Sequence, residues 1–127
     1  MEIKVIQEKS PKCPGMYFNP DGNLLTIEGR SIPENPEFLY QPLKDWIASY
    51  FIDSDKLNIK IVLEYINSGS SKHLLDVLKI LRSYNQKGKN LMIRWLYEED
   101  DESILELGEH FRDASGLPME IEMILSD

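Results

Sequence analysis

The sequence contains little of what several classes of protein require. Cys13 is the only cysteine, so no disulfide can form within the chain. No apolar run approaches the ~20 residues that a membrane-spanning helix needs, and no basic start followed by an apolar stretch marks a secretory signal. We therefore expect a cytoplasmic protein that does not enter a membrane.

Basic side chains are outnumbered. The chain has 14 Lys and Arg against 22 Asp and Glu, which gives a formal net charge of -8. This balance repels phosphate backbones and anionic lipids, so we expect neither nucleic acid nor a membrane surface as the main partner. The 127 residues are 42% hydrophobic, enough for one core, and neither a repeat nor a linker divides residues 1–127. We predict a single domain.

Strands are predicted where apolar and polar residues alternate or where β-branched residues cluster. The segments MYF and LLTIEG flank Asn-Pro-Asp-Gly-Asn at 19–23, a turn sequence that predicts a β-hairpin. The last predicted strand carries Glu120 and Glu122 on its outward face, which places it near a sheet edge. The strands outside the hairpin are predicted at residues 1–6, 57–66, 91–97 and 119–125.

Helices are predicted in three segments where apolar residues recur every three or four positions: 39–51, 74–81 and 104–111. Asn35 before Pro36 is typical of a cap followed by proline at the first helical position. Pro42 then predicts either a kink or a helix that begins only near Gln41.

Glycines mark the ends of the second and third helices, at Gly88 and Gly116. The elements alternate as strand, hairpin, helix, strand, helix, strand, helix, strand. This order predicts an α/β fold: a mixed, mainly parallel sheet of about five to six strands, with an N-terminal hairpin and three main helices.

Three serines lie in the junction NSGSSKH at 67–73, between a predicted strand and a predicted helix, where open sheets often form sites. A serine hydrolase would need G-x-S-x-G, or a serine three residues before Lys72, where Gly69 stands. A phosphate-binding loop is excluded because Lys72 follows serine rather than glycine. We interpret His73 as a solvated residue of the first helical turn. By themselves, these residues favour helix capping as the reason for the hydroxyls.

The acidic run from Glu98 to Glu102 has the oxygen ligands that Mg²⁺ or Ca²⁺ prefers. Consecutive carboxylates cannot all face one ion, however, and acids at a helix start stabilise it, so a solvated cap is favoured. His110 has no Cys or His at metal-binding spacing. We expect no metal site and no cofactor, and we interpret Trp46 and Trp95 as packing residues.

Three stretches, in this order, resemble the SiaC-type family of bacterial regulatory phosphoproteins: GRSIPENPEFLYQPLKDW, LEYINSGSSKHLLDVL and WLYEEDDESILELGE. The resemblance runs from about Tyr17 to the final strand. It implies a fold similar to STAS-domain anti-sigma-factor antagonists and a protein without catalysis of its own. In the family, the Thr or Ser directly after the Asn that ends this strand is phosphorylated, which corresponds to Ser68 after Asn67. Many relatives carry Thr followed by serines, whereas Gly69 follows here, and Ser70 is the runner-up acceptor.

The resemblance also implies partners. A kinase with the ATPase fold of anti-sigma factors adds the phosphate, and a metal-dependent PP2C-type phosphatase removes it. The unphosphorylated form binds and activates a diguanylate cyclase, which links the switch to cyclic di-GMP and surface-attached growth. On this hypothesis Asn67 and Gly69 shape the turn, and Ser70 or Ser71 caps the helix. Two alternatives stay open: a small enzyme using the serine turn or the acidic run, and a constitutive adaptor without a switch.

Overall fold

The computed structural model describes residues 2–125, and within them it contains six strands and three helices in the predicted order. The strands are β1 (Lys4–Gln7), β2 (Gly15–Asn19), β3 (Leu24–Ser31), β4 (Lys56–Ile66), β5 (Asn90–Glu98) and β6 (Met119–Ile124). The helices are α1 (Pro36–Asp53), α2 (Ser68–Gln86) and α3 (Glu102–Ser115).

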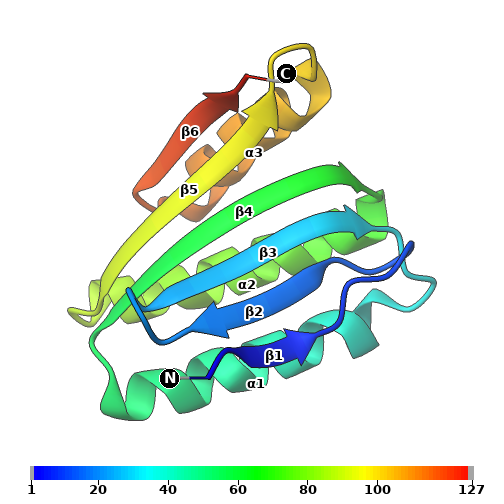
Figure 1. Ribbon diagram of the computed structural model, residues 1–127. Helices are drawn as coiled ribbons and strands as arrows, with labels where there is room; N and C mark the ends of the chain where they lie inside the picture. Colours follow the sequence, from blue (N-terminus) through cyan, green and yellow to red (C-terminus); the bar gives the residue numbers. More distant parts are fainter. Residues whose placement is uncertain (1, 126–127) are drawn as a thin grey trace.

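The strands form one sheet in the order β1-β2-β3-β4-β5-β6 (Figure 1). β2 pairs antiparallel with both β1 and β3, whereas the β3–β4, β4–β5 and β5–β6 pairs are parallel. The predicted hairpin is β2–β3, and its turn places Gly22 and Asn23 at positive φ. The predictions of a mixed, mainly parallel sheet and of a final strand at its edge are confirmed.

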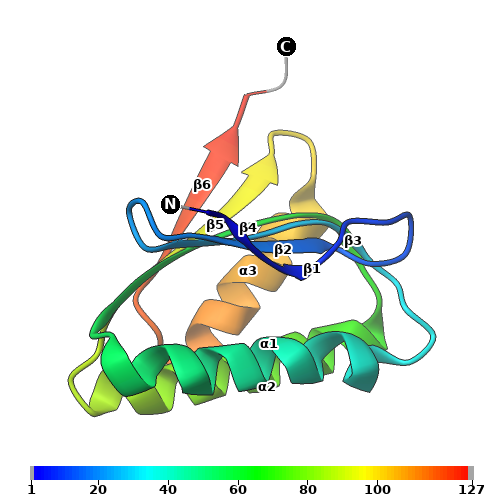
Figure 2. The ribbon, with the colours of Figure 1, turned by 60° about the horizontal axis from the view of Figure 1, so that its bottom comes forward.

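All three helices lie on the same face of the sheet (Figure 2). Each helix connects one parallel strand to the next, and the strands advance in a single direction from β3 to β6. Right-handed crossovers that step the same way must all pass over the same face. Among the described residues, no helix covers the opposite face, which we call the open face.

The core lies between the sheet and the helices. Along β4, Leu57, Ile59, Ile61 and Leu63 are buried, while the residues between them are only partly buried on the open face. Trp95 of β5 is fully buried, and its Nε1 donates a hydrogen bond to the carbonyl oxygen of Ile104 at 2.9 Å. The interpretation of Trp95 as a packing residue is confirmed, as it is for Trp46, which is half-buried and stacks 4.9 Å from Tyr50.

The helix ends follow local sequence signals with one exception. α1 begins at Pro36, directly after Asn35, and runs through the exposed Pro42, so the alternative start near Gln41 is wrong. Asp101 caps α3 by accepting a hydrogen bond from the Ile104 backbone N–H at 3.1 Å, which confirms that the acidic run contributes a helix cap. Gly116 follows α3 in the left-handed conformation.

None of the helices found between residues 2 and 125 combines the length and the apolar character that crossing a membrane requires.

Candidate functional site

The serine junction is held in place by Asn67, the single residue between β4 and α2. Its backbone N–H donates to the Ser31 carbonyl oxygen at 3.0 Å, which ties it to the end of β3. Its side-chain Oδ1 accepts from the Ser70 N–H at 2.8 Å, and its own carbonyl accepts from the Ser71 N–H at 2.9 Å. Asn67 is therefore the helix cap, and the expectation that Ser70 or Ser71 caps α2 is wrong, because the helix already begins at Ser68.

The three hydroxyls of the junction have different environments. Ser68 is exposed, Ser71 is half-buried, and Ser70 is 0% exposed with an Oγ that has no hydrogen-bond partner. Successive residues turn by about 100° around a helix, so positions 68 and 70 point in different directions. Of the three serines, Ser68 is therefore the one most open to solvent.

Gly69 lies in the first turn of α2 rather than in a loop. It is not among the glycines with positive φ, so its backbone is one that other residues adopt. A Cβ added there would lie 3.4 Å from Cγ of Pro36, which shows how closely the starts of α1 and α2 approach. The turn itself is consequently shaped by Asn67.

A buried polar pair lies beneath this end of the sheet. The Ser31 Oγ and Tyr40 Oη are 2.7 Å apart, and both residues are fully buried. Burial raises the pKa of Tyr40 to about 12, although the hydrogen bond with Ser31 acts in the opposite direction. No local pattern in the sequence predicts this pair, because the partners belong to β3 and α1 and meet only through the fold.

His73 differs from its prediction. Its ring stacks on Tyr40 with 6.2 Å between ring centroids, and its Nδ1 is buried without a hydrogen-bond partner. The expected solvated position is wrong because α1 packs along this side of α2. Since Ser70 Oγ also lacks a partner, the described residues contain no hydrogen-bonded Ser70–His73 pair of the kind that activates a nucleophile.

The next feature is the arrangement of the possible metal-ligating side chains. Between residues 2 and 125, no group of three or more His, Cys, Asp or Glu side chains is arranged to hold a metal ion. In the acidic run, Glu98, Glu99 and Asp100 are exposed and Asp101 is occupied as a cap. What the serine junction offers is an exposed hydroxyl next to a helix N-terminus, where an added anion is stabilised.

Comparison with known proteins identifies the family. The model of the "SiaC family regulatory phosphoprotein" matches residues 6–124. The chain belongs to the SiaC family. Our chain is 32% identical over 99 residues to an uncharacterized protein of Pseudomonas aeruginosa (strain UCBPP-PA14). That match covers 77% of this chain and 79% of the relative.

Two solved structures resemble this SiaC-family chain over most of its length. SiaC of Pseudomonas aeruginosa is 26% identical with a TM-score of 0.86, covering 98% of this chain and 100% of that one. A chain in the crystal structure of the diguanylate cyclase SiaD in complex with its activator SiaC, from the same species, is 28% identical with a TM-score of 0.84. That match covers 91% of this chain and 96% of the other. The predicted family is confirmed, and its members are regulatory phosphoproteins.

Proposed function

We propose that this chain is a cytoplasmic binding protein without catalysis of its own, controlled by phosphorylation of Ser68. A kinase with the ATPase fold of anti-sigma factors adds the phosphate, and a PP2C-type phosphatase removes it. The unphosphorylated form binds and activates a diguanylate cyclase. Membership of a family of regulatory phosphoproteins supports this role, as does the likeness to a structure in which SiaC is the activator of a cyclase.

The observation that carries the proposal is the exposure of Ser68 at the first position of α2. A kinase must bring the acceptor hydroxyl into its own active site, which an exposed side chain in a first helical turn permits. Ser70, the runner-up, is 0% exposed, so its phosphorylation would require the start of α2 to open. This contrast favours Ser68 as the acceptor.

A phosphate on Ser68 is compatible with the fold. It adds about -1.5 to -2 charges next to the free N–H groups at the start of α2, where the helix dipole favours an anion by roughly 0.3 to 1 kcal/mol. That gain is small beside a typical domain stability of about 5 to 15 kcal/mol, so the modified domain should keep its structure.

The effect of the phosphate should instead fall on binding. A partner that covers the neutral Ser68 hydroxyl would have to desolvate a dianion after modification. Every ~1.4 kcal/mol of that cost weakens binding tenfold. Phosphorylation would then release the cyclase without unfolding its activator.

Phosphosite mapping tests the acceptor. The purified chain is incubated with the cognate kinase and ATP, and the product is mapped by mass spectrometry beside Ser68→Ala and Ser70→Ala variants. We expect phosphate on residue 68 of the wild type and the Ser70→Ala variant, and none on Ser68→Ala. Phosphate on Ser70 or on the helix residue Ser83, or an unmodified wild type, would contradict the proposal.

A further inference from the structure

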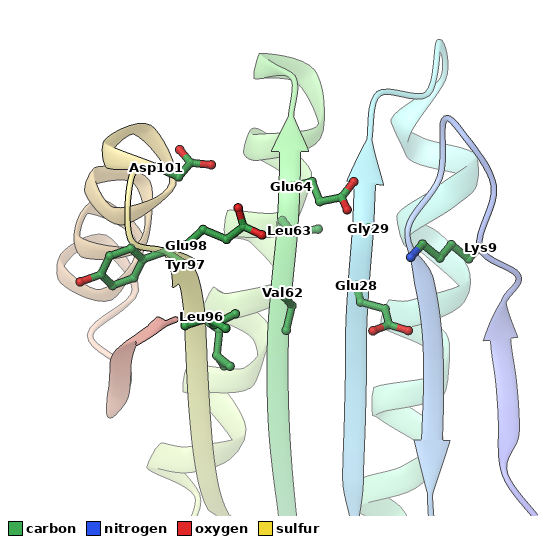
Figure 3. Close-up of a pocket in the computed structure, with 11 residues that line it drawn as sticks. Lys9, Glu28, Gly29, Val62, Leu63, Glu64, Leu96, Tyr97, Glu98 and Asp101 are labelled. Carbon is green, nitrogen blue, oxygen red and sulfur yellow. The ribbon is translucent and has the colours of Figure 1, made fainter. Parts of the chain in front are cut away.

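Two hollows lie at the carboxyl ends of the parallel strands. The first, of about 390 Å³, lies on the open face over β3, β4 and β5 (Figure 3). Glu28, Val62 and Leu96 are register partners in one row across these strands, and the two apolar side chains form its floor. The second, of about 220 Å³, lies between the end of β4 and the start of α3, where Tyr65 and Leu107 line it.

The two hollows are neighbours. Glu64 and Asp101 line both of them, and we call the two adjacent hollows together the edge track. Tyr65 and Ile66, which line the second hollow, directly precede Asn67 in the chain. The edge track therefore includes residues of the open face and residues that immediately precede the turn that presents Ser68.

The charge around the edge track has one dominant sign. Four carboxylates line it, against the single ammonium group of Lys9. Within residues 2–125, none of the four forms an ion pair. The carboxylates are those of Glu28, Glu64, Glu98 and Asp101. A ligand that fits this charge is cationic, and phosphate-bearing ligands are repelled.

The open face is unusual for a parallel sheet. Parallel strands are generally covered on both faces, but in the described residues the helices cover one face only. Val62, Leu96 and Ile124 are nevertheless apolar and only half-buried there. An apolar floor bordered by acids on an uncovered face matches a docking surface for a partner that brings its own apolar and basic side chains.

We propose that the edge track binds a basic, partly apolar segment of the diguanylate cyclase. The proposal rests on the cyclase being the partner under the proposed function. Apolar side chains of the segment lie on Val62 and Leu96, and its Lys or Arg groups face Glu28, Glu64 and Glu98. Because the track ends beside the Ser68 turn, a segment that fills it extends the interface to the hydroxyl that is phosphorylated.

Paired charge reversals test the electrostatic part. Glu28→Lys with Glu98→Lys alters the track, and Asp53→Lys with Glu106→Lys alters exposed helix positions outside it. Each pair removes two negative and adds two positive charges, so both change the formal net charge from -8 to -4. Calorimetric titration with the purified cognate cyclase should show affinity weakened about tenfold or more by the track pair and less than about threefold by the control pair.

A second pair of variants tests the apolar floor. Leu96 and Met92 lie four residues apart on the open face of β5, but only Leu96 lines the track. Leu96→Ala should weaken cyclase binding about tenfold, whereas Met92→Ala should leave it unchanged. Thermal melting of each variant verifies that it is folded before its affinity is compared.

The results distinguish cyclase binding at the edge track from control by Ser68 phosphorylation. Equal affinities of the track variants and their controls would contradict cyclase binding at the edge track. An effect of Ser68 phosphorylation in the same titration would still support the proposed function. Track variants that bind weakly, with no effect of phosphorylation, would support the track and refute the switch. A wild-type chain that does not bind the cyclase would overturn both.

Discussion

The two faces of the sheet differ in composition and in cover. The covered face carries the side chains of residues such as Leu57, Ile59 and Ile61, which are at most 1% exposed beneath the helices. The open face carries Lys60 and Val62 on the same strand, which remain partly exposed. A one-residue step along β4 thus moves from the core to the solvent side.

This difference separates stability from recognition. Burial of apolar surface is the main source of folding free energy, and that burial is concentrated on the covered face. The open face and the end of the sheet at the carboxyl ends of the parallel strands, where the edge track and Ser68 lie, contribute much less to the folding free energy. Changes there can therefore alter binding while the domain stays folded, which is what the proposed phosphorylation switch requires.

The largest contrast is expected between neighbours on β4. Ile61→Ala removes a side chain that is 1% exposed and should lower the free energy of unfolding by about 2 to 5 kcal/mol. Lys60→Ala, one residue away on the open face, should change it by less than about 0.5 kcal/mol. Urea titrations of both variants provide the measurement, and similar losses would show that the two faces are not energetically distinct.

A glycine on the covered side gives the next largest effect. A Cβ at position 108 would lie 2.4 Å from Cδ1 of the fully buried Trp95, so Gly108→Ala must displace the indole. We expect a loss of about 3 kcal/mol, at the upper end of the usual cost of overpacking. Gly69→Ala is the control: its Cβ would meet Pro36 at 3.4 Å, and its stability should be nearly unchanged. A stable Gly108→Ala variant would mean that α3 can move away from β5.

The third largest effect on stability is expected at the buried Ser31–Tyr40 pair. Tyr40→Phe leaves the buried Ser31 hydroxyl without its partner and should cost roughly 1 to 2 kcal/mol. The change should also alter the pH dependence. Burial raises the pKa of Tyr40 to about 12, whereas an unfolded tyrosine loses its proton near 10. The stability from this group is present below pH 10 and is lost as the pH rises towards 12.

Denaturant titrations at pH 8, 10 and 11 measure both effects. Wild type should lose stability over this interval more steeply than Tyr40→Phe does. Equal slopes would mean that the Tyr40 hydroxyl titrates normally and is not sealed in the core.

The smallest effect is expected on the open face, at Glu122. Arg94 donates to it at 2.7 Å, and this hydrogen bond lowers the pKa of the Glu122 carboxyl. The stability it contributes is present at neutral pH and is lost as the pH falls through that lowered pKa. Glu122→Gln should therefore flatten the acid side of the stability profile slightly. Glu120→Gln, on the same strand face, is the control. An identical stability profile for the two variants would show that the Arg94–Glu122 pair does not contribute to the pH dependence of stability.

Much of the fold could be predicted because its signals are local. Alternation on β4 and helical spacing from Leu74 to Leu81 depend only on neighbouring residues, and the glycines after α2 and α3 mark where those helices end. The residues of the junction by themselves favoured helix capping, and Ser68 was named as the acceptor only through the resemblance to the SiaC-type family, in which the residue after this Asn is phosphorylated. These features need no knowledge of which elements meet in space.

The rest depends on contacts between distant segments. His73 was expected in solvent because nothing near it in the chain shows that α1 packs against it through Tyr40. The cap of α2 was expected at Ser70 or Ser71 because the spacing of apolar residues does not determine at which residue the helix begins. In the structure, Asn67 is the cap. The edge track joins β3, β4, β5 and α3, so only the folded chain reveals it.

The affinity of the cognate diguanylate cyclase for the chain, with and without phosphate on Ser68, tests the central claim most directly. Stoichiometrically phosphorylated and unphosphorylated protein would be compared in the same calorimetric titration, with far-ultraviolet circular dichroism to verify that both are folded. We predict that the phosphate weakens binding by about tenfold or more, while the spectrum stays the same. Equal affinities of the two forms would contradict the account and leave a constitutive adaptor in its place.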